Sequence, residues 1–162
     1  MQALLDGYTK SMPPSNFDSA FTKATTVVSV TTDSGPDTTA KATFAFTIPP
    51  GCANNPLGGG QTHGGAVATF LDNITSAALV ASKRYWGQGM SRTMNITYLR
   101  SPREGDRCVI EAEVVHIGRR VASVHGRMKR ETDGALLAMC THEKLLVEGE
   151  GKGYEAYYAK LS

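Results

Sequence analysis

The 162-residue chain is long enough for one domain with a real core, and its 41% hydrophobic and 20% charged residues are ordinary for a globular protein. A net charge of +2 is too small to predict nucleic acid or an anionic membrane as the main partner. The apolar runs are too short for a membrane-spanning helix. Cys52, Cys108 and Cys140 are odd in number and widely spaced, which argues against a disulfide framework or a zinc site and favours reduced thiols.

The N-terminal residues 1–22 are predicted to form an arm with a short helix, broken at Pro13 and Pro14. This segment has no apolar core of signal-peptide length, so we expect a cytoplasmic protein and leave a mitochondrial location open. Residues 25–32 are rich in β-branched side chains and predict a strand. Residues 41–49 predict a second strand, because apolar residues alternate there on one face: Ala42, Phe44, Phe46 and Ile48.

A loop rich in Gly, Pro and Asn covers residues 49–65, and the apolar period then changes to steps of three and four. This change predicts one long helix over 64–85. Strand-like alternation returns over 91–99, 108–114, 122–128 and 135–147, with "ETDG" (131–134) as a hairpin signal. The domain is therefore expected over residues 23–148, followed by a polar tail at 149–162.

Two strands, a helix and four strands joined by short turns predict an α+β fold, in which a largely antiparallel sheet of about six strands packs on one helix. A single helix cannot cover both faces of such a sheet, so we expect a dimer or a larger assembly.

Asp72 is unusual because it lies within the apolar run of the predicted helix. It shares a narrow face with small residues such as Thr69 and Ser76. One interpretation is close helix packing, with the Asp72 carboxylate bonded to Thr69 or Ser76. The other is a carboxylate that acts as a base or nucleophile in a partly dry site.

The glycines at the helix start suggest a second functional feature. Backbone N–H groups in a first helical turn lack intrahelical acceptors, and glycine lets a ligand oxygen approach them. An N–H of Gly64 or Gly65 can therefore hold a developing oxyanion. A phosphate loop fits poorly, since no Lys-Ser/Thr follows the glycines. His63 is a candidate to orient this loop, to act as a general base or to donate a hydrogen bond to substrate.

Three segments carry a resemblance to a known family: "THGGAVATFLDNITSAAL" (62–79), "GMSRTMNITYLRSPREGD" (89–106) and "GRRVASVHGRMKRETDGALLAMCTH" (118–142). They resemble the hotdog-fold acyl-CoA thioesterases of the phenylacetate-pathway (PaaI-like) group, which includes the thioesterase superfamily member two type. The resemblance covers about residues 25–147 and implies the hotdog fold, in which an antiparallel sheet wraps a long central helix.

The resemblance also implies roles for individual residues. Asp72 would activate water or attack the thioester, and Gly64 would polarise the carbonyl through its N–H. Ser91 would position the water or the carboxylate, and Asn55 would assist at the thioester. The active site would lie between two subunits of a homodimer, itself half of a homotetramer.

The loop before the helix departs from the family pattern. The family asparagine usually lies six residues before the histidine, where this chain has Leu57. Aligning "NPLGG" recovers Asn55, eight residues before His63, although Asn54 is an alternative. The extra glycines at 58–60 indicate a changed acyl pocket rather than a phosphate site.

The implied reaction is hydrolysis of acyl-CoA without a metal or a bound cofactor. We expect cations on turns to bind the CoA phosphates, with a solvated turn residue as the alternative for each: Arg100, Arg103, Arg119 and Arg120. The other functional hypotheses are a thioesterase for carrier-protein-bound polyketide or fatty acyl chains and a non-catalytic acyl-CoA-binding module. A hotdog dehydratase is disfavoured, because the helix contains no histidine.

Overall fold

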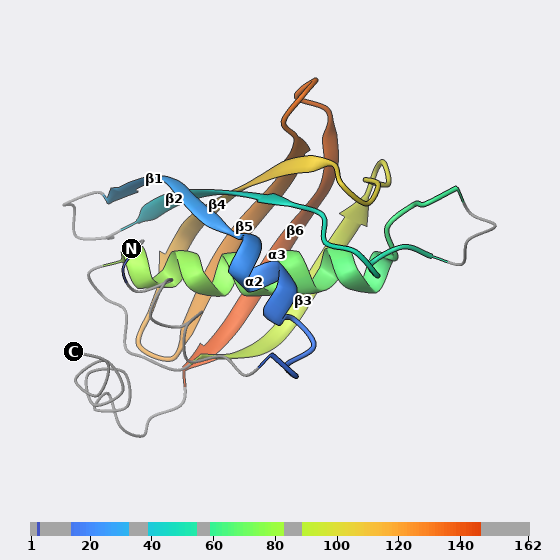
Figure 1. Cartoon of the computed structure of the whole chain (residues 1–162). Coiled ribbons are helices and arrows are strands. Elements are labelled where there is room, and N and C mark those ends of the chain that lie inside the picture. Colours follow the sequence, from blue (N-terminus) through green and yellow to red (C-terminus); the bar gives the residue numbers. More distant parts are fainter. Residues whose placement is uncertain (1–2, 4–13, 33–38, 55–58, 83–88, 147–162) are drawn as a thin grey trace.

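The computed structural model describes residue 3 and residues 14–32, 39–54, 59–82 and 89–146. Its elements follow one another in the predicted order (Figure 1). They are α2 (Ser19–Ala24), β1 (Thr26–Thr32), β2 (Ala40–Thr47), α3 (Gly64–Ala78), the 3-10 helix η2 (Leu79–Ala81), β3 (Gly89–Tyr98), β4 (Arg107–Ile117), β5 (Val121–Arg130) and β6 (Leu136–Leu146).

The six strands form one antiparallel sheet in the order β1-β2-β4-β5-β6-β3. Figure 1 shows this sheet curving around the long helix α3. The strand after the helix, β3, crosses to the far edge and pairs with β6, so β3 and β1 are the two edge strands. This arrangement confirms the predicted hotdog fold.

The core lies between α3 and the concave face of the sheet, and it is built from the alternating apolar positions that the sequence predicts. The four residues predicted to face inward from the second strand, three in β2 and Ile48 directly after it, are at most 1% exposed. The inward positions of β4 and β5 are buried in the same way: Cys108, Ile110, Ala112, Val114, Ala122, Val124 and Met128. Alternation therefore sets which face of each strand meets the helix.

The short helix α2 packs against β2 and α3. Its Phe21 is 3% exposed and stacks on Phe70 of α3 with ring centroids 4.4 Å apart. The Phe21 ring also meets the edge of Phe46 at 4.7 Å. The predicted boundary between arm and domain, at residue 22, thus falls inside an element that contributes to the core.

The long helix ends earlier than the sequence predicts within the described residues. It runs from Gly64 to Ala81 if η2 is included, while residues 83–88 lie outside the described part of the chain. Its length and composition would suffice to cross a membrane. However, one stripe of this helix packs against the sheet, with buried Phe70, Leu71 and Ile74, as in the core helix of a globular domain.

Candidate active site

The start of α3 is closed by the side chain of His63. His63 is the N-cap residue with φ −62° and ψ 136°, and its Nδ1 accepts a hydrogen bond from the Gly65 N–H at 2.9 Å. An Nδ1 that accepts is unprotonated, so the proton of the neutral ring is on Nε2. This bond fits the role of orienting the loop, while the roles of His63 as a general base and as a donor to substrate stay predictions. The same bond occupies the N–H of Gly65, which was a predicted substrate contact.

The N–H of Gly64 is the exception in this first turn. The N–H groups of Ala66 and Val67 both point to the His63 carbonyl, at 2.9 and 3.2 Å. Among the described residues, none accepts a hydrogen bond from the Gly64 N–H. The Tyr98 hydroxyl donates to the Gly64 carbonyl at 3.2 Å, which ties the helix start to β3. The Gly64 N–H is therefore held in place without an acceptor in the described part of the chain.

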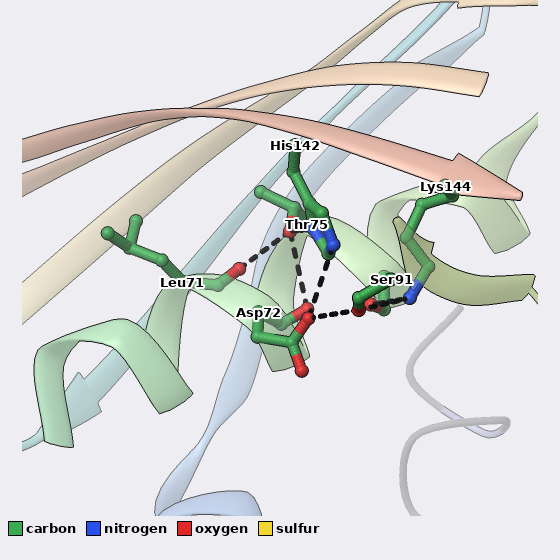
Figure 2. Close-up of polar contacts among 7 residues, drawn as sticks. Leu71, Asp72, Thr75, Ser91, His142 and Lys144 are labelled. Atoms are coloured by element: carbon green, nitrogen blue, oxygen red, sulfur yellow. Dashed lines mark hydrogen bonds and ion pairs between the residues drawn. The ribbon is translucent and has the colours of Figure 1, made fainter. Parts of the chain in front are cut away.

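Asp72 lies two turns further along α3, with its side chain 39% exposed. The hydroxyl of Ser91, on β3, donates to Asp72 Oδ1 at 2.8 Å (Figure 2). The pairing of β3 with β6 shifts between Ser91 and Thr93, which marks a β-bulge. Bulges of this kind re-aim side chains at sheet edges, and here the bulge directs the serine to the helix.

The packing interpretation of Asp72 predicted different partners, and it is wrong in both. Thr69 donates to the Gly65 carbonyl at 3.0 Å, within its own helix. The Ser76 hydroxyl accepts from Lys144 of β6 at 2.9 Å. The Asp72 carboxylate is instead bonded across to the sheet, by a residue 19 positions later in the sequence.

His142 of β6 is a member of this cluster that the sequence reasoning missed. Its side chain is fully buried, with Nε2 3.3 Å from Asp72 Oδ1 and Nδ1 2.7 Å from Thr75 Oγ1 (Figure 2). Burial lowers the pKa of His142 from 6.5 to about 4, and the Lys144 charge adds to the effect, while Asp72 and Glu143 oppose it. The imidazole is therefore neutral at pH 7.

A neutral His142 can carry its proton on either nitrogen. With the proton on Nδ1, the ring donates to Thr75 Oγ1, and the Thr75 hydroxyl donates to the Leu71 carbonyl at 2.7 Å. With the proton on Nε2, Nδ1 accepts the Thr75 proton instead. Nε2 lies 3.3 Å from Asp72 Oδ1, but it makes no hydrogen bond with the described residues.

Lys144 is the second residue that the sequence reasoning missed. It is only 5% exposed and donates from Nζ to Ser76 at 2.9 Å and to Ser91 at 3.1 Å. Burial lowers its pKa from 10.5, and the Asp72 charge partly offsets this. The signal for both missed residues was strand alternation, since the inward positions of β6 are Ala138, Cys140, His142 and Lys144.

The other predicted site residues divide between the two ends of the molecule. Arg100 donates to the Leu136 carbonyl at 3.0 Å, and the backbone of Arg103 forms a β-bridge with that of Gln61, in the loop before α3. Both arginines therefore lie toward the helix start. Arg119 and Arg120 lie on the β4–β5 turn, beside the Val121–Leu145 pair and thus toward Asp72. Asn55 falls outside the described residues.

The two buried cysteines offer no competing chemistry. Burial raises the pKa of Cys108 to about 12 and that of Cys140 to about 11, so both are protonated thiols at neutral pH. No cluster of three or more His, Cys, Asp or Glu side chains suited to a metal ion occurs among the described residues. The polar cluster of Asp72, Ser91, His142 and Lys144 is thus the main candidate for a catalytic centre.

Comparisons with known proteins show which proteins this chain resembles. Residues 59–137 match the thioesterase superfamily. Acyl-coenzyme A thioesterase 13 from Homo sapiens is 37% identical over 87 residues, which are 54% of this chain and 61% of that protein. The match thus spans about three fifths of the length of the curated relative.

Solved structures agree over a longer range. Thioesterase superfamily member 2 from zebra fish is 27% identical with a TM-score of 0.72, covering 90% of this chain and 95% of that one. The Mus musculus structure of thioesterase superfamily member 2 is 29% identical with a TM-score of 0.69, covering 91% and 98%. Residues 59–137 of this chain are therefore similar to the thioesterase superfamily, and the chain shares the hotdog fold of these thioesterase structures.

Proposed function

We propose that the protein is an acyl-CoA thioesterase that hydrolyses its substrate to a free acid and CoA. The observation that carries this proposal is the partly exposed Asp72 carboxylate, held by Ser91 and faced by a buried neutral His142. The likeness to acyl-coenzyme A thioesterase 13 supports the choice of substrate. The reaction needs no metal or bound cofactor.

Asp72 and Gly64 would divide the work of hydrolysis. The Gly64 N–H would donate to the thioester oxygen and stabilise its negative charge as the tetrahedral intermediate forms. Asp72 would take a proton from the attacking water, or attack the carbonyl carbon itself to give an anhydride that water then opens. In either route the C–S bond breaks, and the CoA thiolate leaves and takes up a proton.

The spacing of these two residues along one helix points to a site made by two chains. Eight residues separate Gly64 from Asp72, which corresponds to about 12 Å at 1.5 Å per residue. An oxyanion donor must lie about 3 Å from the oxygen while the attacking group lies within about 3.5 Å of the attached carbon. When Asp72 itself attacks the carbonyl carbon, one chain cannot meet both conditions, and we propose that Asp72 of one protomer works with Gly64 of its partner.

A homodimer would also bring together the two groups of arginines. Arg100 and Arg103 lie toward the Gly64 end of a chain, and Arg119 and Arg120 lie toward the Asp72 end. Joining the Gly64 end of one protomer to the Asp72 end of its partner would place both groups around one substrate. We propose that they serve the CoA phosphates, and that two such dimers form a homotetramer in the cytoplasm.

The activity is tested by Asp72→Asn, with release of free thiol measured across short, long and aromatic acyl-CoAs. Asn keeps the size of the side chain and still accepts from Ser91, so the fold should persist while kcat falls by about 10²–10⁴. Glu113→Gln, on the outer face of β4, is the matched control. Near-normal turnover in Asp72→Asn would refute the assignment. Faster release from carrier-bound acyl chains would redirect it to a carrier-protein substrate.

The two-chain site is tested by complementation. Gly64→Pro removes the proposed donor at the first helical position, where proline is tolerated, and the extended ψ of His63 (136°) suits a following proline. Its kcat should fall by about 10²–10³. Unfolding and refolding this variant with Asp72→Asn gives heterodimers with one intact site of two. Random pairing should then restore about a quarter of wild-type activity, whereas a site within one chain would give no recovery.

A further inference from the structure

We propose that Lys144 is a positioning residue that orients the Ser91 hydroxyl, so that this hydroxyl donates its hydrogen bond to Asp72. This inference rests on the proposed function of Asp72 and adds to it. Lys144 lies behind Ser91 as seen from the carboxylate, so that the three groups form a chain from the sheet to the helix (Figure 2).

The direction of each hydrogen bond follows from what each group can donate. An ammonium has only donors, so Lys144 Nζ must donate to Ser91 Oγ across the 3.1 Å between them. The hydroxyl of Ser91 has one proton, which is then available to Asp72 Oδ1 at 2.8 Å. A second bond, to Ser76 Oγ at 2.9 Å, holds the ammonium against α3.

The pairing of the strands explains why Lys144 lies beside Ser91. Ser91 and Lys144 are directly opposite one another in the β3–β6 pair, immediately before the bulge in β3. Opposite residues in antiparallel strands project to the same face, which here is the face toward α3. The register that buries the rest of β6 thus also sets the lysine behind the serine.

A purely structural role is a poor explanation for this lysine. Burying an ammonium carries a large desolvation cost, and an unbranched apolar side chain would fill the same space without it. Asp72 is 39% exposed, so water can solvate its carboxylate if the lysine is removed. We therefore expect Lys144→Met to fold with a melting temperature equal to or above that of the wild type.

The decisive experiment is a double-mutant cycle on kcat with Lys144→Met, Ser91→Ala and the double variant. If Lys144 acts through Ser91, Lys144→Met lowers kcat by about 10–100-fold alone, the loss typical of partners that orient a functional group. The same substitution should cost less than about threefold in the Ser91→Ala background. KM should change little, because Lys144 would not touch the substrate.

Two further variants make the cycle robust. Lys129→Met is the matched control, since Lys129 pairs with Glu111 on the outer face of the sheet, and it should leave kcat unchanged. Lys144→Gln repeats the cycle with a polar side chain in case Lys144→Met fails to fold. Equal losses in both backgrounds, or no loss from Lys144→Met, would overturn the inference while leaving an active wild type. Absence of turnover in the wild type would refute the proposed function itself.

The wild-type pH profile provides a second readout that needs no lysine variant. Among the described residues, the titratable groups that face Lys144 are Asp72 from α3 and His142 from its own strand, while β3 offers Ser91 and β5 offers Ala122. A deprotonated Lys144 could accept the Ser91 proton and draw it away from Asp72. The kcat of the wild type should therefore decline at alkaline pH, and Ser91→Ala should abolish that decline. An identical alkaline limb in both proteins would contradict the proposal.

Discussion

The buried imidazole of His142 makes a quantitative prediction for stability against pH. Its pKa is about 4 in the folded chain and about 6.5 when unfolded, so between these values only the unfolded state binds the proton. The free energy of unfolding is therefore unaffected by His142 above pH 6.5, where both states hold a neutral imidazole. It decreases as the pH falls toward 4, because protonation then stabilises only the unfolded state. At about 1.4 kcal/mol per pH unit, this interval of about 2.5 units corresponds to about 3.5 kcal/mol.

The assay is equilibrium urea unfolding of wild type and His142→Gln from pH 7.5 to 4.5, at one fixed protomer concentration because assembly would shift apparent stability. Gln can keep hydrogen bonds in the cavity but does not titrate. The free energy of unfolding should fall more steeply with decreasing pH in the wild type than in His142→Gln. The difference in slope should correspond to the uptake of up to one extra proton per chain on unfolding. His125→Gln, at an exposed position on β5, is the matched control for the substitution. Parallel curves for wild type and His142→Gln would refute the reasoning.

Two packing predictions test how the sheet and α2 pack against α3. Gly126→Ala should lower the free energy of unfolding by about 1–3 kcal/mol, because the added methyl would lie 2.8 Å from Cys140 Sγ and 3.0 Å from Thr75 Cγ2; an unchanged urea midpoint would contradict this. Phe21→Ala should lower the free energy of unfolding by about 3–5 kcal/mol, since its ring is buried between two other aromatic rings. Thermal unfolding in a single transition would show that α2 belongs to the domain. A cost below about 1 kcal/mol would instead mark α2 as a separable arm.

The sequence was sufficient for most of the fold because its apolar periods match the elements that form. The alternating residues of β2 and β4 and the three-and-four spacing of α3 each identify a face that must be buried. The "ETDG" signal likewise predicts a tight connection, and Gly134 adopts φ +68° there, in the left-handed region that favours glycine. Local rules suffice where the requirement is local.

The polar partners of Asp72 could not be found by the same local rules, and only the family resemblance named Ser91 as a residue that positions the water or the carboxylate. Helical spacing supplies only neighbours on the same helix, such as Thr69 and Ser76, whereas the partners found lie on β3 and β6. Knowing that Ser91 meets Asp72 requires the crossover of β3 to the far edge and the bulge within it. Both depend on tertiary pairing, which a single-sequence pattern does not specify.

The inward face of β6 shows how such a centre can be recognised once the strand is placed. Its first inward residues, Ala138 and Cys140, follow the apolar rule, and the next two, His142 and Lys144, break it. Buried titratable groups lower the stability of the fold, so a function other than stability must retain them. Both of these groups converge on one helical carboxylate. A selection for stability alone would have continued the apolar series. The change from apolar to ionisable side chains along one buried strand face is therefore itself evidence that this end of the sheet serves Asp72.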